Sequence, residues 1–176
     1  DRLDRTGAGC CRGVDRVVSG PGATPLARRI PVGNEGDFLG VVDLVGMRAL
    51  TWRGETQKGE DYAVEEIPAE LAEQAAEYRE KLLETLSEAD DAIMEKFLEG
   101  ESFTVDEINA AIRRATLADK LTPVLTGSAF KNKGVQPMLD AVVAYLPSPL
   151  DITAIEGHKP GHEDVVIERQ PSDSEP

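Results

Sequence analysis

Residues 126–142 read TGSAFKNKGVQPMLDAV, and this stretch decides the fold that the sequence predicts. An apolar run at 122–125 leads into the small-residue turn Thr126-Gly127-Ser128-Ala129, and a basic loop then enters an amphipathic helix over about 134–145. A strand, a turn and a helix in this order form half of an α/β unit. Open sheets of that class bind ligands at the carboxyl ends of their strands, which is where this turn lies.

Apolar periodicity predicts a β-rich segment followed by helices. Segment 24–67 fits three or four short antiparallel strands, and a short helix is expected before it, over 8–19. Three helices follow, at about 68–88, 90–99 and from 104, where Thr104 and Glu107 form a capping box. The side chains expected in the core are Leu71, Ala75, Tyr78, Leu82, Leu86, Ile93, Phe97, Leu98, Ile108, Ala111, Ile112, Ala115 and, on the last helix, Val135, Met138, Leu139, Val142 and Val143.

The composition excludes several classes of function. The formal charge of −14 repels phosphate backbones, so we expect no autonomous nucleic-acid binding. No apolar run is long enough for a membrane helix, and the charged first residues do not resemble a signal peptide. We therefore expect a cytoplasmic protein without membrane contact, and a monomer. Neither the adjacent Cys10 and Cys11 nor the pair His158 and His162 has a convincing metal-ligand arrangement, so no metal site is predicted.

The small-residue turn has groups that a guanine-binding site requires. Guanine presents N1–H and the N2 amine side by side, so one carboxylate can accept both, while a backbone N–H donates to O6. Ala129 is suited to supply that N–H because its methyl group lets a flat base approach, and the Ser128 hydroxyl can brace the turn. The same pattern also fits an ordinary strand-to-helix connection. Lys131 and Lys133 could bind phosphate or simply lie at the rim of a base pocket.

Five motifs resemble those of bacterial elongation factor G, the translocation GTPase. They are DRTGA at 4–8, GVVDL at 40–44, ALTW at 49–52, GSAFKNKGVQ at 127–136 and YLPSP at 145–149. The motifs occur in order and without large gaps, and the last two together are the most specific. The resemblance implies an α/β fold: the C-terminal part of a P-loop GTPase domain, interrupted by an inserted α+β subdomain with a small antiparallel sheet and three helices.

The resemblance also implies four parts of the chain. Residues 1–20 would hold the end of the guanine-reading motif and the helix that follows it. Residues 21–118 would form the inserted subdomain, known as G prime, and residues 119–150 the last strand and helix of the GTPase domain. Residues 151–176 would be a linker toward a second domain outside this chain.

A guanine site on two distant segments follows from the same resemblance. The family reads guanine with an Asn-Lys-x-Asp motif and a Ser-Ala turn, which correspond here to Asp4 and to Ser128, Ala129 and Phe130. Asp1 and Arg2 stand where the family has Asn and Lys. Arg2 can lay its stem over a base, whereas Asp1 lacks the amide donor that Asn offers.

The resemblance implies GTP or GDP as the ligand of the full-length protein, without catalysis by this chain alone. No glycine in the sequence is followed by lysine, so the phosphate loop Gly-x-x-x-x-Gly-Lys-Ser/Thr is absent. We therefore expect no catalytic residue, no switch motif, no Mg²⁺ ligand and no GTP hydrolysis by the isolated chain. Translocation, recycling and ribosome-protection factors are all compatible with these motifs.

An acidic helix supports an alternative function, that of a protein-interaction module. Segment 68–99 carries ten acidic and three basic residues, whereas segment 1–33 carries six Arg and three Asp. An acidic surface accelerates the encounter with a basic partner. By the resemblance the partners would be the ribosome and its stalk protein, contacted by Glu70, Glu73, Glu77, Glu80 and Glu84.

Overall fold

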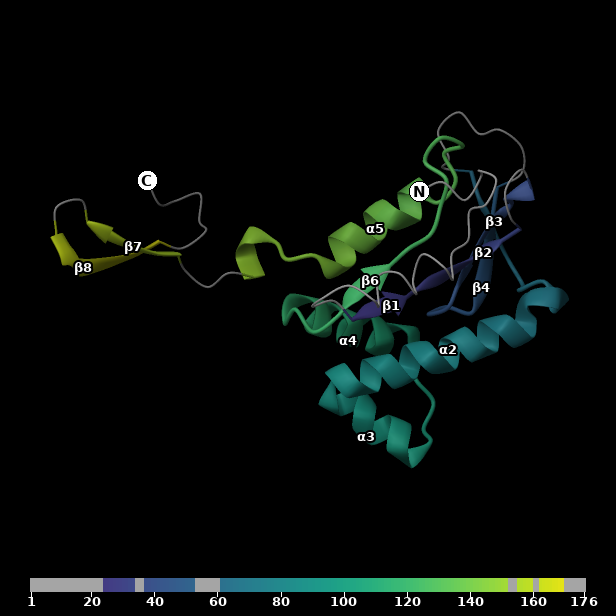
Figure 1. Ribbon diagram of the computed structural model, residues 1–176, viewed down its shortest axis with the longest axis horizontal. Helices are drawn as coiled ribbons and strands as arrows, with labels where there is room; N and C mark the ends of the chain where they lie inside the picture. The colour runs from purple at the N-terminus through teal and green to yellow at the C-terminus, as the bar shows by residue number, and fades with distance from the viewer. Residues whose placement is uncertain (1–23, 34–36, 53–60, 152–154, 160–161, 170–176) are drawn as a thin grey trace. The chain divides into compact units, whose positions relative to one another are not determined.

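The computed structural model describes residues 24–33, 37–52, 61–151, 155–159 and 162–169. The chain divides into two units, Asp1–Tyr145 and Leu146–Pro176. The described residues of the first unit form a small antiparallel sheet, a pair of parallel strands and several helices (Figure 1). The first unit therefore has the mixed α/β architecture that the sequence predicted, and the helix expected over 8–19 lies outside the described residues.

The antiparallel sheet is a meander with the strand order β2-β3-β4-β5. Its strands are β2 (Arg29–Val32), β3 (Gly40–Asp43), β4 (Arg48–Thr51) and β5 (Ala63–Glu65). Each is short and rich in Val, Ile, Leu or Ala, and each pairs with its neighbour in the sequence. The prediction of three or four short antiparallel strands is confirmed.

Strands β1 (Pro25–Ala27) and β6 (Thr122–Val124) pair in parallel. Backbone hydrogen bonds extend the pair at both ends, from Thr122 N–H to Thr24 O at 2.8 Å and from Arg28 N–H to Val124 O at 2.9 Å. The sequence assigned β1 to the inserted subdomain and β6 to the GTPase domain. In the structure the two strands share one sheet. The predicted boundaries, which place residues 21–118 and 119–150 in different domains, therefore separate two strands that are hydrogen-bonded to each other.

The first unit contains four described α-helices, two of which have clear end signals. They are α2 (Ala69–Ala89), α3 (Asp91–Glu99), α4 (Val105–Leu117) and α5 (Val135–Tyr145). Helix α4 begins with the predicted capping box: Glu107 N–H donates to the Thr104 hydroxyl at 3.2 Å, and Thr104 N–H donates to the Glu107 carboxylate at 2.9 Å. Gly100 ends α3 with a left-handed φ of 69°, as a helix-ending glycine does.

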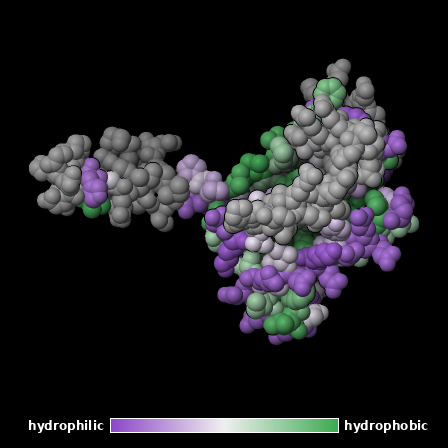
Figure 2. All heavy atoms as spheres, viewed as in Figure 1, coloured by the Kyte–Doolittle hydropathy of each residue, from purple (hydrophilic) through white to green (hydrophobic). Residues whose placement is uncertain are grey.

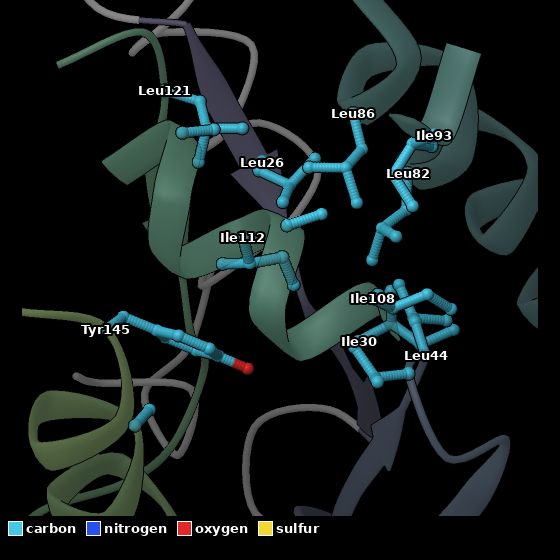
Figure 3. Packing of buried hydrophobic residues seen from close by; sticks show 14 of the residues in the cluster. Leu26, Ile30, Leu44, Leu82, Leu86, Ile93, Ile108, Ile112, Leu121 and Tyr145 are labelled. Atoms are coloured by element: carbon cyan, nitrogen blue, oxygen red, sulfur yellow. The ribbon is translucent and has the colours of Figure 1, made fainter. Parts of the chain in front are cut away.

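The main core lies between β1, one face of the meander and the helices α2, α3 and α4. Figure 3 shows Leu82 and Leu86 of α2 and Ile112 of α4 close to Leu26 of β1. A smaller core, made of Phe38, Val41, Leu50 and Trp52, uses the opposite face of the meander, because side chains alternate between faces along each strand. Most of the predicted core is confirmed, since these side chains are buried: Ala75, Leu82, Leu86, Ile93, Ile108, Ala111, Ile112 and Ala115.

Two predictions of buried faces are wrong. On α5 the buried residues are Pro137, Ala141 and Tyr145, and Val135 is half-buried. The side chains predicted to be buried there are exposed, by 44% for Met138, 53% for Leu139, 43% for Val142 and 82% for Val143. On α3, Leu98 is 80% exposed, because the short helix turns Ile93 inward and Leu98 falls on another side.

The second unit contains a short 3-10 helix, η2 (Pro149–Asp151), and an antiparallel pair of strands, β7 (Ile155–Lys159) and β8 (His162–Arg169). The sequence predicted a linker without regular structure here. The run of three β-branched residues at 165–167, flanked by charged residues, is a strand signal in this segment. Within the described part of the chain, no helix has the length and apolar content needed to cross a membrane.

Candidate functional site

Residues 128–133 form a closed turn between β6 and α5, called here the 128–133 turn. Ser128 and Lys133 exchange two backbone hydrogen bonds, one from Ser128 N–H to Lys133 O at 2.9 Å and one from Lys133 N–H to Ser128 O at 3.0 Å. Inside this bridge Asn132 N–H donates to Ala129 O at 3.1 Å, and Asn132 has a left-handed φ of 53°. The backbone of the turn is therefore held by its own hydrogen bonds.

Small residues around the turn are required by close backbone contacts. A Cβ on Gly127 would lie 2.8 Å from the Lys133 carbonyl oxygen, and Gly134 has a φ of 89° that side chains disfavour. Ser128 is fully buried, and its hydroxyl oxygen accepts a long hydrogen bond from Lys131 N–H at 3.4 Å. The hydroxyl thus lies where the sequence expected it to brace the turn.

The tip of the turn points its groups outward. Ala129 is exposed, and the Phe130 side chain is 90% exposed. Among the described residues, no acceptor takes a hydrogen bond from Ala129 N–H. A backbone N–H without an acceptor, beside a small exposed residue and an exposed aromatic ring, can serve a flat ligand with an acceptor at its edge.

Lys133 contacts a distant segment of the chain. Its Nζ donates to the carbonyl oxygen of Phe38 at 2.9 Å, across 95 residues of sequence. Burial, and secondarily the charge of Lys131, lower the pKa of the Lys133 ammonium below its usual value. The sequence left open whether Lys131 and Lys133 bind phosphate. The structure shows that the Lys133 ammonium bonds to the protein's own backbone.

The predicted guanine-binding residues divide into two groups. Asp1, Arg2 and Asp4 lie outside the described residues. Of the predicted guanine-binding residues that the structure describes, Ser128, Ala129 and Phe130 lie together in one local turn.

The predicted partner-binding glutamates form an exposed row on α2. Their spacing of three and four residues places them on one side of the helix, opposite the buried Ala75, Leu82 and Leu86. Figure 2 shows hydrophilic side chains along α2. Glu77 forms an ion pair with Lys81 one turn away. All five residues are exposed: Glu70, Glu73, Glu77, Glu80 and Glu84.

Although we expected no switch motif, the sequence contains three matches to Asp-x-x-Gly, the spacing of a GTPase switch motif. Asp37 and Gly40 lie where the chain enters β3, and Asp43 and Gly46 lie where it leaves. Asp43 accepts a hydrogen bond from Val45 N–H at 3.2 Å and pairs with Arg28 at 3.3 Å. These two matches belong to turns of the meander. A third, at 4–7, lies outside the described residues.

A buried polar network that the sequence did not predict joins the connection between β1 and β2 to α4 and α5. Arg28 Nε donates to the Tyr145 hydroxyl at 2.6 Å, and that hydroxyl donates to Asn109 Oδ1 at 2.6 Å. Arg29, which is 4% exposed, lies beside Arg28, and its Nε and Nη1 have no hydrogen-bond partner among the described residues. Burial, and secondarily Arg28, lower the pKa of Arg29 to about 10. Two adjacent arginines at the start of an apolar strand were the available signal.

Two ion pairs fasten the helices. Asp90 accepts two hydrogen bonds from Arg114, at 2.8 and 3.1 Å, and this pairing lowers the pKa of its carboxyl group. Glu107 accepts a hydrogen bond from Lys96 at 2.6 Å, and that bond, followed by those from Thr104, lowers the pKa of Glu107 to about 2. In the segments that the structure describes, no group of three or more His, Cys, Asp or Glu side chains could hold a metal ion.

Comparisons with known proteins relate the fold to a solved structure. No known family model matches the sequence. The fold is similar to that of the crystal structure of ttk003000868 from Thermus thermophilus, with a TM-score of 0.70 and 28% sequence identity. The match covers 87% of this chain and 23% of that protein, so the chain spans about a quarter of its length. That designation states no activity.

Proposed function

We propose that this chain is a segment of an elongation factor G-like translational GTPase, comprising the C-terminal part of the nucleotide-binding domain and its inserted subdomain. In the complete factor, GTP or GDP would bind, and hydrolysis on the ribosome would drive translocation. This segment would contribute the reading of the guanine base, and it would not hydrolyse GTP by itself.

The observation that carries the proposal is the 128–133 turn in its structural setting. A strand with a parallel partner, β6, leads into a turn closed by its own backbone bonds, and α5 follows. Ligands of α/β sheets bind at this end of a strand. The N–H of the exposed Ala129 would donate to guanine O6, and Asp4 would accept from N1–H and the N2 amine.

The exposed side of α5 supports a larger domain around this turn. Its Met138, Leu139, Val142 and Val143 side chains form an apolar surface, and Figure 2 shows hydrophobic side chains gathered over this helix. Parallel sheets normally have both faces covered and more than two strands. Further parallel strands of the nucleotide-binding domain would extend the β1–β6 pair and bury this side of α5.

The test is a nuclear magnetic resonance titration of the ¹⁵N-labelled chain with guanosine, and with adenosine as the matched control. Guanosine should shift the amide signals of Ala129 and Phe130 at millimolar concentration, because a base without phosphate contacts binds weakly. Adenosine presents the opposite donor and acceptor pattern and should not shift them. Equal shifts by both nucleosides, or none by guanosine, would refute guanine reading by this turn.

Nucleotide affinity and hydrolysis supply a second check. Without a phosphate loop the chain should bind GDP weakly and should release phosphate from GTP no faster than buffer does. We assign the phosphate contacts to a segment of the complete factor that is not in this sequence. A submicromolar affinity of this chain for GDP, measured by calorimetry, would contradict that assignment.

The exposed acidic row on α2 favours a second candidate function, the binding of a basic partner protein. On the ribosome this partner would be the stalk protein. The C-terminal domain of that protein should shift amide signals along α2, less at high salt, because exposed charges are screened. Replacing Glu73, Glu80 and Glu84 with Gln should reduce the shifts, whereas replacing Glu95 and Glu99 of α3 should not. Shifts confined to the second unit would refute this candidate.

A further inference from the structure

We infer that Lys133 is a positioning residue for the 128–133 turn, which it fixes to the meander through the hydrogen bond from its ammonium to the Phe38 carbonyl. The role in base reading rests on the proposed function. The fixing of the turn does not, because it follows from the contacts of Lys133 alone.

Lys133 lies at the position where the two ends of the turn are hydrogen-bonded to each other. Its own N–H and carbonyl groups form the bridge to Ser128, so any movement of the Lys133 backbone moves both sides of the turn. The neighbouring glycines add to this rigidity. The backbone at Gly127 passes so close to the Lys133 carbonyl that a Cβ would lie 2.8 Å from it. The side chain of Lys133 therefore anchors a backbone that has little freedom of its own.

The acceptor at the other end is also well fixed. Phe38 is 1% exposed and belongs to the smaller core with Trp52. The next residue is held on both sides: Leu39 N–H donates to Val32 O at 2.9 Å, and Trp52 N–H donates to Leu39 O at 3.0 Å. The Phe38 carbonyl thus has a position set by the meander, which lets it locate the lysine.

The environment of the ammonium favours this bond over a contact with phosphate. Lys133 is half-buried, and the removal of an ammonium from water is unfavourable unless an acceptor replaces the water. The Phe38 oxygen, 2.9 Å away, is such an acceptor. The meander therefore takes part in placing Ala129 N–H, and displacement of a recognition group by about 1 Å is enough to weaken its action strongly.

The test compares three variants of the ¹⁵N-labelled chain by amide hydrogen exchange and by guanosine titration. Lys133→Met keeps the aliphatic stem and removes the donor, and Lys133→Arg restores a donor. Lys131→Met removes a charge of the same kind from the same turn without removing the bond to Phe38. In Lys133→Met we expect the Ser128 and Lys133 amides to exchange about tenfold faster, with core amides of α2 and α4 unchanged. Lys131→Met should match the wild type, and Lys133→Arg should recover most of the protection.

Each outcome decides the inference. Unchanged protection in Lys133→Met overturns it, and so does an equal loss across the core of the first unit, because that would show a merely structural role. If guanosine shifts the wild-type turn, Lys133→Met should lower the response at Ala129 about fivefold or more, in line with misplacement of the donor. If guanosine shifts nothing in the wild type while protection falls only at the turn of Lys133→Met, the positioning role stands and the proposed function is wrong.

Discussion

Asp90 at the start of α3 provides the sharpest test of how the helices are held. Its carboxylate accepts Ile93 N–H at 3.2 Å as a helix cap and also accepts two hydrogen bonds from Arg114. Loss of a cap costs about 1 kcal/mol. The Arg114 side chain is 55% exposed, so the ion pair adds only about 0.5–1 kcal/mol after screening by water. Asp90→Ala should therefore lower the free energy of unfolding by about 1.5–2 kcal/mol.

Urea unfolding followed by far-ultraviolet circular dichroism measures this loss, and Asp90→Asn divides it. Asn is also a good cap residue, so Asp90→Asn should lose only the contribution of the charge, about 0.5–1 kcal/mol. Asp91→Ala, at an exposed neighbouring position, is the control and should change stability little. Equal losses in Asp90→Ala and Asp90→Asn would show that the cap contributes nothing.

The pH dependence of the same pair has a definite sign. Because the pKa of folded Asp90 is below the ordinary value of 3.8, its ionised form stabilises the fold. That contribution is complete above about pH 4 and is lost as the pH falls through the lowered pKa of the folded state. The difference in the free energy of unfolding between the wild type and Asp90→Asn should therefore become smaller as the pH falls. A difference that grows on acidification would refute the reasoning.

Three further predictions concern single side chains. Tyr145→Phe removes the hydroxyl between Arg28 and Asn109 and should lower the free energy of unfolding in urea by about 1–3 kcal/mol, because the buried Arg28 donor loses its acceptor. Asn109→Ala should cost less in the Tyr145→Phe background than in the wild type, because the bond between the two residues is already lost. A carbon-detected titration should find the Glu107 pKa near 2, and Lys96→Met should move this pKa back toward 4.5. The ionised Glu107 carboxylate stabilises the fold above about pH 4.5, and this stabilisation is lost as the pH falls toward 2. An unchanged Glu107 pKa in Lys96→Met would contradict the assigned cause. Gly127→Ala should break the bridge between Ser128 and Lys133 and abolish the exchange protection of both amides, whereas Gly157→Ala, where a Cβ meets nothing within 4 Å, should leave them unchanged.

Local signals predicted the helical part of the fold well. The capping box of Thr104 and Glu107 involves groups three residues apart, so its sequence pattern contains all the information needed. The inward side of α2 was also predictable, because Leu82 and Leu86 repeat at helical spacing and charged residues occupy the other sides.

The orientation of α5 could not be predicted in the same way. Apolar residues occur on most of its surface, so periodicity does not identify the buried side. The Tyr145 hydroxyl, which bonds with Arg28 and Asn109, together with the small Ala141, selects that side. Arg28 and Asn109 lie far from Tyr145 in the sequence, so no local pattern predicts these contacts.

The sequence predicted the turn of the candidate site, but it did not predict the contact of that turn with a distant segment of the chain. The small residues of GSA predicted a tight connection, which the structure contains. The bond from Lys133 to Phe38 spans 95 residues and ends on a backbone carbonyl, which has no side-chain identity to recognise. The residues Asp1, Arg2 and Asp4 remain a prediction from the resemblance.

The parallel pairing of β1 with β6 has a consequence for the order of folding. The crossover between the two strands contains the meander and three helices, whose contacts are mostly local and form quickly. The parallel pair joins distant residues and becomes favourable only after the crossover has shortened the distance between them. Pulsed hydrogen exchange during refolding should therefore protect amides of α2 and α4 before the Thr122 amide, and simultaneous protection would contradict this order. The 128–133 turn would then reach its final position last, after the body that supports it has folded.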